Sequence, residues 1–219
     1  MRFSRNHPAI SPAEQEKLNR SHVLVLGCGG LGGAIIENLV RLGVGHITAV
    51  DGDSFDETNL NRQILSTGET LGMNKALAAK ARARSINPDV DFRAVEGFFT
   101  EANGAALLEG IDLVMDALDS VPARLTLEKL CAGKGLSIVH GAVQGWIAQV
   151  AVVTPGSGLL TRLYEGKSGS DDLSCLAFTC AFCAALQCAE AAKLLCGRKV
   201  ESGLLLVDLR SMDFETIDI

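Results

Sequence analysis

The chain has 219 residues, of which 47% are hydrophobic and 21% charged, and its formal net charge is −6. This length predicts one α/β domain over residues 1–219, and no low-complexity stretch divides it. The negative charge gives no general attraction to nucleic acid or to anionic membranes, so we expect neither as a partner. The N-terminus lacks the apolar core of a signal peptide and no apolar run is long enough to span a membrane, so we expect a cytoplasmic protein.

Residues 11–51 show the pattern of a short helix followed by a strand, a second helix and a second strand. Ser11 and Pro12, followed by acidic residues, predict a short helix before the first strand. An apolar strand at 23–27, a helix at 30–43 and a strand at 46–51 then form a βαβ unit, which should be right-handed. Between the first strand and the helix lies a glycine loop, whose backbone can come close to phosphate: Gly27, Gly29, Gly30 and Gly32.

Polar residues follow the second strand, where open α/β sheets bind ligands. Asp51 ends that strand about twenty residues after the last glycine of the loop, where a carboxylate can accept hydrogen bonds from a ribose. Asp53 either assists it or is a solvated turn residue. The loop at 52–72 and the next helix carry groups suited to phosphate, namely Asn59, Arg62, Gln63 and Lys75.

The later elements extend the same alternation. We expect helices at 73–87, 101–109 and 122–134 and strands at 91–99, 111–117 and 137–141, followed by short strands without helical crossovers and one long helix at 176–196. Residues 156–172 are too rich in Gly, Ser and charge for a regular element and predict a flexible crossover loop. The fold class is therefore α/β, a Rossmann-like, mainly parallel sheet with helices on both faces and an antiparallel C-terminal extension.

The glycine pattern alone is weak and is most often that of a dinucleotide dehydrogenase, so the other residues must identify the chemistry. An NAD-dependent reductase needs a proton donor, and only His140, Tyr164 and scattered lysines are available, without a recognisable motif. Arg62 and Lys75 can instead neutralise a triphosphate, and Asp119, after the strand at 111–117, can hold Mg²⁺ together with phosphate oxygens. This set favours attack on the α-phosphate of ATP, which is adenylation of an acid. The reductase and a non-catalytic nucleotide sensor stay as alternatives.

Several spaced motifs resemble the ThiF/MoeB/HesA family, the bacterial relatives of ubiquitin-activating enzymes. They cover nearly the whole chain and occur in the family's order: RFSR at 2–5, GCGGLGG at 27–33, VDGD at 50–53, NLNRQ at 59–63, LGMNK at 71–75, INP at 86–88 and LDS at 118–120. The resemblance implies Mg-ATP-dependent adenylation of the C-terminal glycine of a ubiquitin-like sulfur carrier that ends in Gly-Gly, for thiamin or molybdopterin synthesis.

The same resemblance assigns site residues. It implies an ATP site made of Gly29, Gly30, Asp51, Asn59, Arg62, Gln63, Lys75 and Asp119. It also implies a homodimer in which Arg5 reaches the triphosphate bound to the other subunit.

Three departures from the family pattern stand out. Ser120 replaces the family's usual asparagine, as in the relatives that dehydrate threonylcarbamoyladenosine in tRNA, so that activity is an alternative. The paired CxxC motifs of many members are missing, so we expect no structural zinc. We expect no rhodanese extension either.

The seven cysteines, an odd number, suit reduced thiols better than a disulfide framework. Cys180 and Cys183 lie within an apolar helix and favour core packing over metal binding. Cys175 precedes that helix, where family members often carry an acyl- or sulfur-accepting cysteine and where a helix start can lower a thiol pKa. Cys180 competes for the same role.

Three other polar residues near strand ends have less specific interpretations. We expect His140 to be a hydrogen-bonded core histidine rather than a catalyst. Asp116 is a weaker candidate than Asp119 because it lies less far into the loop. Arg124 is equally suited to a salt bridge and to ligand contact.

Overall fold

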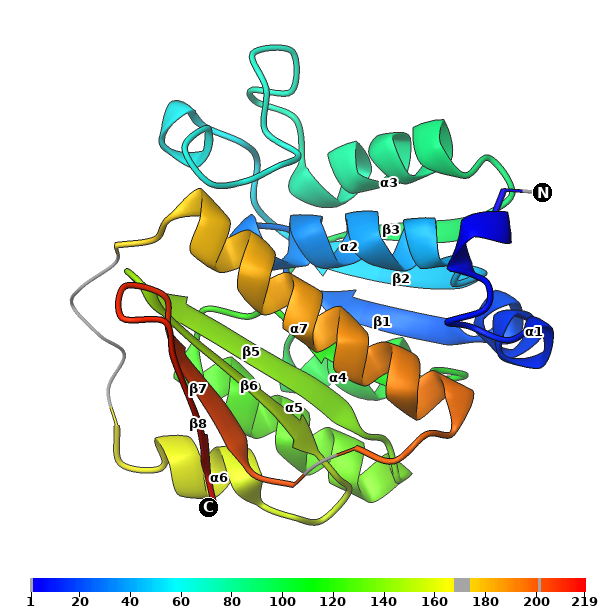
Figure 1. Cartoon of the computed structure of the whole chain (residues 1–219). Helices are drawn as coiled ribbons and strands as arrows, with labels where there is room; N and C mark the ends of the chain where they lie inside the picture. The colour runs from blue at the N-terminus through cyan, green and yellow to red at the C-terminus, as the bar shows by residue number, and fades with distance from the viewer. Residues whose placement is uncertain (1, 168–173, 201) are drawn as a thin grey trace.

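A computed structural model describes residues 2–167, 174–200 and 202–219. Its centre is one sheet with the strand order β3-β2-β1-β4-β5-β6-β7-β8 (Figure 1). Strands β3 through β5 run parallel, and each later strand pairs antiparallel with its neighbour. The strands are β1 (His22–Leu26), β2 (His46–Asp51), β3 (Asp91–Glu96), β4 (Leu113–Asp116), β5 (Ile138–Gln144), β6 (Ile147–Val153), β7 (Leu204–Asp208) and β8 (Asp213–Ile217). The predicted fold class, including the antiparallel extension, is confirmed.

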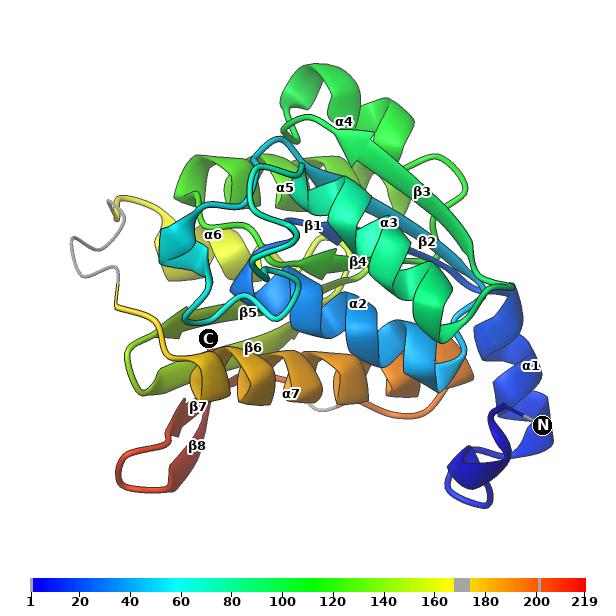
Figure 2. The ribbon, with the colours of Figure 1, turned by 90° about the horizontal axis from the view of Figure 1, so that it is seen from above.

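Helices cover both faces of this sheet, as the view from above shows (Figure 2). One face carries α1 (Pro12–Arg20), α2 (Gly30–Leu42), α3 (Lys75–Ile86) and α7 (Ala177–Cys196). The other face carries α4 (Glu101–Leu107), α5 (Val121–Lys134) and α6 (Leu159–Tyr164). Two 3-10 turns, η1 (Ser4–Asn6) and η2 (Glu57–Asn59), complete the elements. Ser11 caps α1 through a capping box with Glu14, as its position in the sequence predicts.

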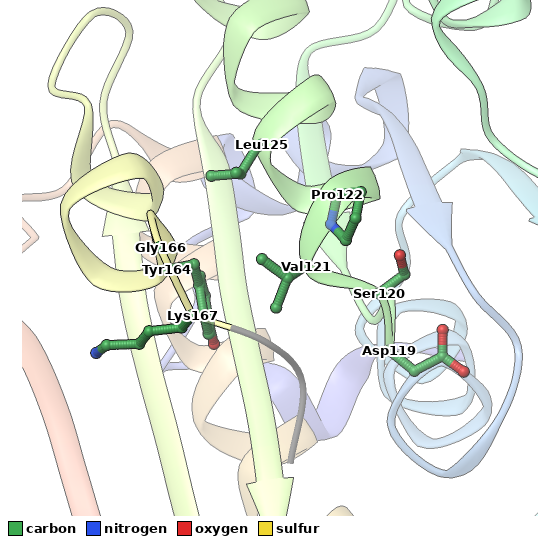
Figure 3. A pocket seen from close by; sticks show the side chains of 8 residues that line it. All are labelled: Asp119, Ser120, Val121, Pro122, Leu125, Tyr164, Gly166 and Lys167. Atoms are coloured by element: carbon green, nitrogen blue, oxygen red, sulfur yellow. The ribbon is translucent and has the colours of Figure 1, made fainter. Parts of the chain in front are cut away.

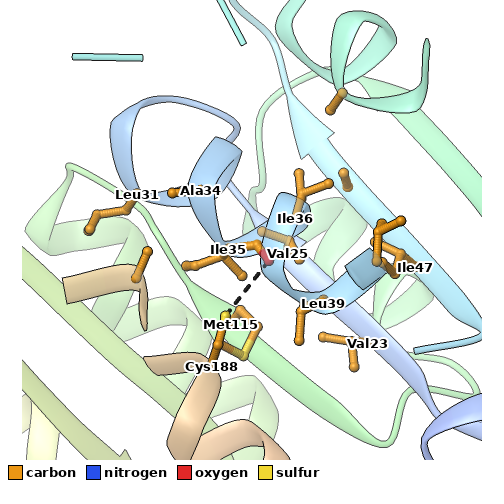
Figure 4. Close-up of a cluster of buried hydrophobic side chains, with 14 of the residues drawn as sticks. Val23, Val25, Leu31, Ala34, Ile35, Ile36, Leu39, Ile47, Met115 and Cys188 are labelled. Carbon is orange, nitrogen blue, oxygen red and sulfur yellow. Dashed lines mark hydrogen bonds between the residues drawn. The ribbon is translucent and has the colours of Figure 1, made fainter. Parts of the chain in front are cut away.

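The period-two alternation of β1 divides its side chains between the two cores. Val23 and Val25 join the cluster under α2 and α7, and Leu24 and Leu26 join the cluster under α4 and α5. Figure 4 shows the first cluster, in which Cys188 of α7 packs beside Ile35 of α2. Each fully buried Val or Leu contributes roughly 1.5–3 kcal/mol, so β1 is anchored from both sides.

The topological switch point of the sheet lies between the neighbouring strands β1 and β4. After β1 the chain continues to β2 and β3 on one side, and after β4 it continues to β5 on the other side, so the loops that follow β1 and β4 turn away from each other. A crevice at the carboxyl ends of such strands is the usual ligand site of open α/β sheets. The loop after β1 carries the glycines, and the loop after β4 carries Asp119.

The prediction that residues 156–172 form no regular element is wrong in part. Leu159–Tyr164 form α6, which begins after Gly158 in the left-handed conformation. Glu128 of α5 accepts hydrogen bonds from the N–H groups of Leu160 (2.7 Å) and Thr161 (2.8 Å). A carboxylate at a helix N-terminus pairs with unpaired donors and interacts favourably with the helix dipole, so a residue 32 positions before Leu160 stabilises this helix. Residues 168–172 of the predicted loop lie outside the described residues.

Helix α7 is long and apolar enough to cross a membrane by length and composition, and it is the one such helix in the described part of the chain. It packs across β5 and β6 and along α2 (Figure 1). Its buried residues belong to the larger hydrophobic cluster, including Cys183, Ala184, Cys188 and Ala191. These contacts are those of a core helix.

Candidate nucleotide-binding site

The glycine loop after β1 is tightly packed. Gly27 has a φ of +93°, and a Cβ there would lie 2.5 Å from the carbonyl oxygen of Ala117. A Cβ on Gly32 would lie 1.8 Å from the carbonyl oxygen of Gly27. No side chain fits at either position, because backbone atoms cannot move aside. These two glycines therefore set the shape of the loop.

The middle glycines have different neighbours. A Cβ on Gly29 would meet Gln63 only at ordinary contact distance, 3.6 Å, so the protein itself leaves this position open. A Cβ on Gly30 would lie 2.8 Å from the sulfur of Cys180 on α7. A side chain at Gly30 would therefore displace the sulfur of Cys180, so close packing of α7 favours glycine here, in addition to its availability for close approach to a phosphate. The sequence pattern indicated only the second reason.

Asp51 holds the glycine loop in place. Its Oδ2 accepts a hydrogen bond from the N–H of Cys28 at 2.7 Å, and its Oδ1 accepts one from the N–H of Asp53 at 2.8 Å. Each oxygen keeps a further lone pair for another donor. The ribose contact stays a prediction, and the loop-holding role is an addition to it.

Lys75 begins α3 and is buried, with 10% of its side chain exposed. Its ammonium lies 3.1 Å from Oδ2 of Asp53, whose side chain is 55% exposed. Asp53 is therefore the counter-ion of Lys75 rather than a free turn residue, and its assistance to Asp51 at a ribose stays a prediction. Because Asp53 is solvated, an incoming phosphate can share or replace this partner at little cost.

Three of the predicted nucleotide-site residues lie in the loop around η2. Asn59 is buried, and its amide oxygen accepts a hydrogen bond from the N–H of Asp56, which closes the turn. Arg62 donates from Nη1 to the carbonyl oxygen of Thr58 (2.7 Å) and to Oδ1 of Asn61 (2.8 Å). Gln63 is buried against Gly29, and its Oε1 has no hydrogen-bond partner among the described residues. An unpartnered buried acceptor beside the glycine loop suits a ligand donor.

Asp119 lies at the mouth of a cavity of about 670 Å³ between α5 and α6 (Figure 3). Asp119 and Ser120 lie on one side of the cavity and Tyr164 and Lys167 on the other, with Val121 between them. Within the described residues Asp119 makes no hydrogen bond or ion pair. No group of three potential metal ligands occurs in the described part of the chain. One carboxylate with phosphate oxygens still fits Mg²⁺, which is often bound that way.

A buried polar network lies beneath this cavity, and sequence reasoning did not predict it. Asp116 is fully buried, and its Oδ2 accepts a hydrogen bond from Nδ1 of His140 at 2.7 Å and lies 3.5 Å from Nε of Arg124. Its Oδ1 accepts from the N–H of Leu118 at 2.9 Å, which positions the loop that carries Asp119. His140 is thus a hydrogen-bonded core residue as predicted, and Arg124 is a salt-bridge partner.

The network shifts the pKa values of its members. Burial raises the pKa of Asp116, but the bond from His140 and the charge of Arg124 outweigh burial, and the net pKa is lowered. Burial lowers the pKa of His140 against the opposing effect of Asp116, so the imidazole is neutral near pH 7. The hydroxyl of Tyr164 lies 3.0 Å from Nε2 of His140, and burial raises the pKa of Tyr164 to about 12. Tyr164 therefore links this network to the cavity as a neutral phenol.

Cys175 lies close to Cys180, with a distance of 3.0 Å between the two sulfur atoms. The hydrogen bond from Cys180 and the charge of Arg62 together lower the pKa of Cys175 to about 7, against the effect of burial. The bond to Cys175 and burial raise the pKa of Cys180. Burial likewise raises the pKa of Cys183, whose sulfur lies against the carbonyl oxygens of Ala142 and Gln149. Cys175 is the more exposed and more acidic thiol of the first pair.

Arg5 lies at the opposite end of α2 from the glycine loop. Its neighbour Asn6 donates to the carbonyl oxygen of Leu42, at the C-terminal end of that helix, at 3.1 Å. The 13 residues of α2 separate the two ends by roughly 20 Å. Arg5 therefore cannot reach the glycine loop of its own chain. Its predicted role at the triphosphate bound to another subunit is compatible with this position and stays a prediction.

Known proteins are similar to this chain in sequence and in fold. The chain is 32% identical to the SAMP-activating enzyme E1 of Haloferax volcanii, over 95% of this chain and 80% of that protein. It is 34% identical to the sulfur carrier protein ThiS adenylyltransferase of Bacillus subtilis, over 95% of this chain and 65%, just under two thirds, of that protein. The structure superposes on the E. coli tRNA N6-threonylcarbamoyladenosine dehydratase TcdA with a TM-score of 0.76 and 25% identity, over 90% of this chain and 94% of that one.

The family pattern described as the ThiF family matches residues 3–219. The match includes the glycine loop, the loop around η2 that carries Arg62, and the antiparallel extension described above. The chain therefore belongs to the ThiF family.

Proposed function

We propose that this protein is an ATP-dependent adenylyltransferase that activates the C-terminal glycine carboxylate of a ubiquitin-like sulfur carrier ending in Gly-Gly. The observation that carries the proposal is the arrangement of polar residues around the glycine loop. Asp51 is bonded to the loop at Cys28, Gln63 lies against Gly29, and the backbone of Arg62 lies against Gly30. Acidic and amide side chains thus lie beside a backbone suited to phosphate, and Arg62 adds a cationic side chain to the adjoining loop.

The other two charged groups adjoin the same loop. Lys75 is joined to it through Asp53 and Asp51, and Asp119 follows Ala117, which packs against Gly27. In the proposed reaction the carboxylate attacks the α-phosphorus, an acyl–phosphate bond forms, and the bond to pyrophosphate breaks. Lys75 and Arg62 would stabilise the charge that develops on the departing phosphates. Asp119 would hold Mg²⁺, which supplies further charge neutralisation when bound.

The relatives support ATP-dependent nucleotidyl transfer over the reductase alternative. The Bacillus relative is a ThiS adenylyltransferase and the archaeal relative is an activating enzyme for SAMP. Membership of the ThiF family favours nucleotidyl transfer over hydride transfer, so the reductase alternative loses support. We propose thiamin or molybdopterin synthesis as the pathway class and the cytoplasm as the location. We also propose that no structural zinc is needed.

The test is carrier-dependent exchange of pyrophosphate into ATP. The wild-type protein should catalyse exchange with a carrier ending in Gly-Gly and not with the same carrier shortened by that dipeptide. Lys75→Met and Arg62→Ala should each lower the exchange rate roughly 100-fold, because each removes a charge aimed at the phosphates. Arg84→Ala is the matched control, since it removes an exposed charge from the far end of α3. Failure of the wild type with every Gly-Gly carrier of the same organism would contradict the proposal.

Mixing two inactive variants tests whether Arg5 acts on a second subunit. In a homodimer, Arg5→Ala and Lys75→Met would each inactivate both sites. After subunit exchange, half of the dimers are mixed, and each mixed dimer has one site with both residues intact. We expect recovery of about a quarter of wild-type activity on mixing. No recovery, in a mixture shown by native mass spectrometry to contain mixed dimers, would show that Arg5 does not act in trans.

A second candidate is an ATP-dependent dehydratase of threonylcarbamoyladenosine in tRNA. Ser120 at the position after Asp119, and the similarity to E. coli TcdA, favour it. The net charge of −6 argues against an RNA substrate, because phosphate binding needs basic surface. Conversion of modified tRNA by the purified protein, with no carrier-dependent exchange, would select this function instead.

A further inference from the structure

The two sulfur atoms near the glycine loop form a pair that the adenylation reaction does not require. Cys175 precedes α7, and its carbonyl oxygen accepts a hydrogen bond from Nδ2 of Asn61. Cys180 lies in the first turn of α7 and is 1% exposed. The sulfur atoms are 3.0 Å apart, and neither cysteine is in a disulfide. A disulfide has a sulfur–sulfur distance of about 2.05 Å, so closure needs a movement of about 1 Å.

The two thiols have different surroundings, which give them different chemical roles. Cys175 is partly exposed, lies beside Arg62 and accepts the hydrogen bond from Cys180, so its thiolate is accessible and stabilised. Cys180 is enclosed by α7 and by the backbone at Gly30, so no molecule the size of glutathione can reach it directly. An accessible thiolate next to a buried thiol is the arrangement of an attacking cysteine and a resolving cysteine.

We propose that Cys175 and Cys180 are a redox-active dithiol that exchanges with small disulfides such as oxidised glutathione. The Cys175 thiolate attacks one sulfur of glutathione disulfide, a mixed disulfide forms, and one glutathione thiolate leaves. Cys180 then gives up its proton to solvent and attacks the sulfur of Cys175, which releases the second glutathione. The protein loses two electrons and two protons, and glutathione disulfide gains them. The proposal concerns the thiols alone, so it stands or falls independently of the adenylation reaction.

The neighbouring cysteine provides a matched control. Cys183 is buried on the same helix, and its sulfur contacts backbone carbonyl oxygens of β5 and β6 rather than a thiol. If proximity to Cys175 defines the pair, Cys183→Ser should behave as the wild type does. If any pair of cysteines on α7 can be oxidised, Cys183→Ser should change the product.

The experiment incubates the reduced full chain with glutathione disulfide, quenches free thiols by alkylation and maps the products by mass spectrometry. For the wild type and Cys183→Ser we expect loss of two hydrogens and a peptide linked through Cys175 and Cys180, reversed by dithiothreitol. For Cys180→Ser we expect a stable glutathione adduct on Cys175. For Cys175→Ser we expect neither product, because Cys180 is enclosed.

Three results would overturn the proposal. The first is a wild-type protein that accumulates the glutathione adduct as Cys180→Ser does, since Cys180 would then not resolve it. The second is a disulfide between Cys180 and Cys183. The third is a wild-type protein in which both thiols stay reduced. The positive control for this result is a folded protein with an added exposed cysteine, which must be oxidised in the same buffer.

Discussion

The substitution Asp116→Asn tests the buried network beneath the cavity. It removes the carboxylate that accepts the hydrogen bond from His140 and pairs with Arg124, while it keeps the shape of the side chain. Arg124 has 9% of its side chain exposed, so its charge would lose a partner in a place that water does not reach. Breaking a buried ion pair from one side costs roughly 3–5 kcal/mol. Because Arg124 keeps its contact with the ring of Tyr164 at 5.1 Å, we expect the lower end of that range.

Urea denaturation at pH 7 measures this loss. For a slope of about 3 kcal/mol per M, a loss of roughly 3 kcal/mol lowers the midpoint by about 1 M. Since the folded-state pKa of Asp116 lies below its ordinary value of 3.8, its contribution is fully present above that pH and disappears as the pH falls through the folded pKa. The difference between wild type and variant should therefore shrink in acid.

The control for this prediction is the same change in an exposed pair. Asp89 accepts a hydrogen bond from Arg2 at 2.8 Å, but its side chain is 82% exposed. Asp89→Asn should leave the urea midpoint nearly unchanged, because exposed ion pairs contribute little. A loss below 1 kcal/mol for Asp116→Asn, or strict additivity with Arg124→Met in a double-mutant cycle, would refute the reasoning.

Three further predictions concern pH, helix α6 and thiol reactivity. Burial lowers the pKa of His140 in the folded state, so the unfolded chain binds one more proton below about pH 6.5 and the free energy of unfolding falls as the pH falls. His140→Asn should therefore flatten the pH dependence of the urea midpoint between pH 7.5 and 5.5. Glu128→Ala removes the acceptor for two N–H groups of α6, which should exchange with deuterium roughly 10-fold faster while those of β6 do not. Alkylation of Cys175 by iodoacetamide should rise with pH around a midpoint near 7. Cys180→Ala removes the hydrogen-bond donor and should raise that midpoint, so an unchanged midpoint would contradict the assigned hydrogen bond.

The elements of the βαβ unit and the glycine loop could be predicted closely because their signals are local. Strand β1 was expected at 23–27 and is observed at His22–Leu26, and α2 was expected at 30–43 and is observed at Gly30–Leu42. The apolar runs, the glycines and the cap at Ser11 all act within a few residues of the positions they determine. The same reasoning failed for α6, whose N-terminus is satisfied by Glu128 from another helix.

The sequence by itself determined the order of strands and helices, the loop that approaches phosphate and the family resemblance, because these depend on spacing along the chain. Only the tertiary structure showed that Asp116, His140 and Tyr164 meet, since 24 residues separate each from the next. It also showed that Gly30 packs closely against the sulfur of Cys180 and that this sulfur lies beside Cys175. Such contacts depend on how α7 and β5 pack across the sheet, and short-range patterns do not specify that packing.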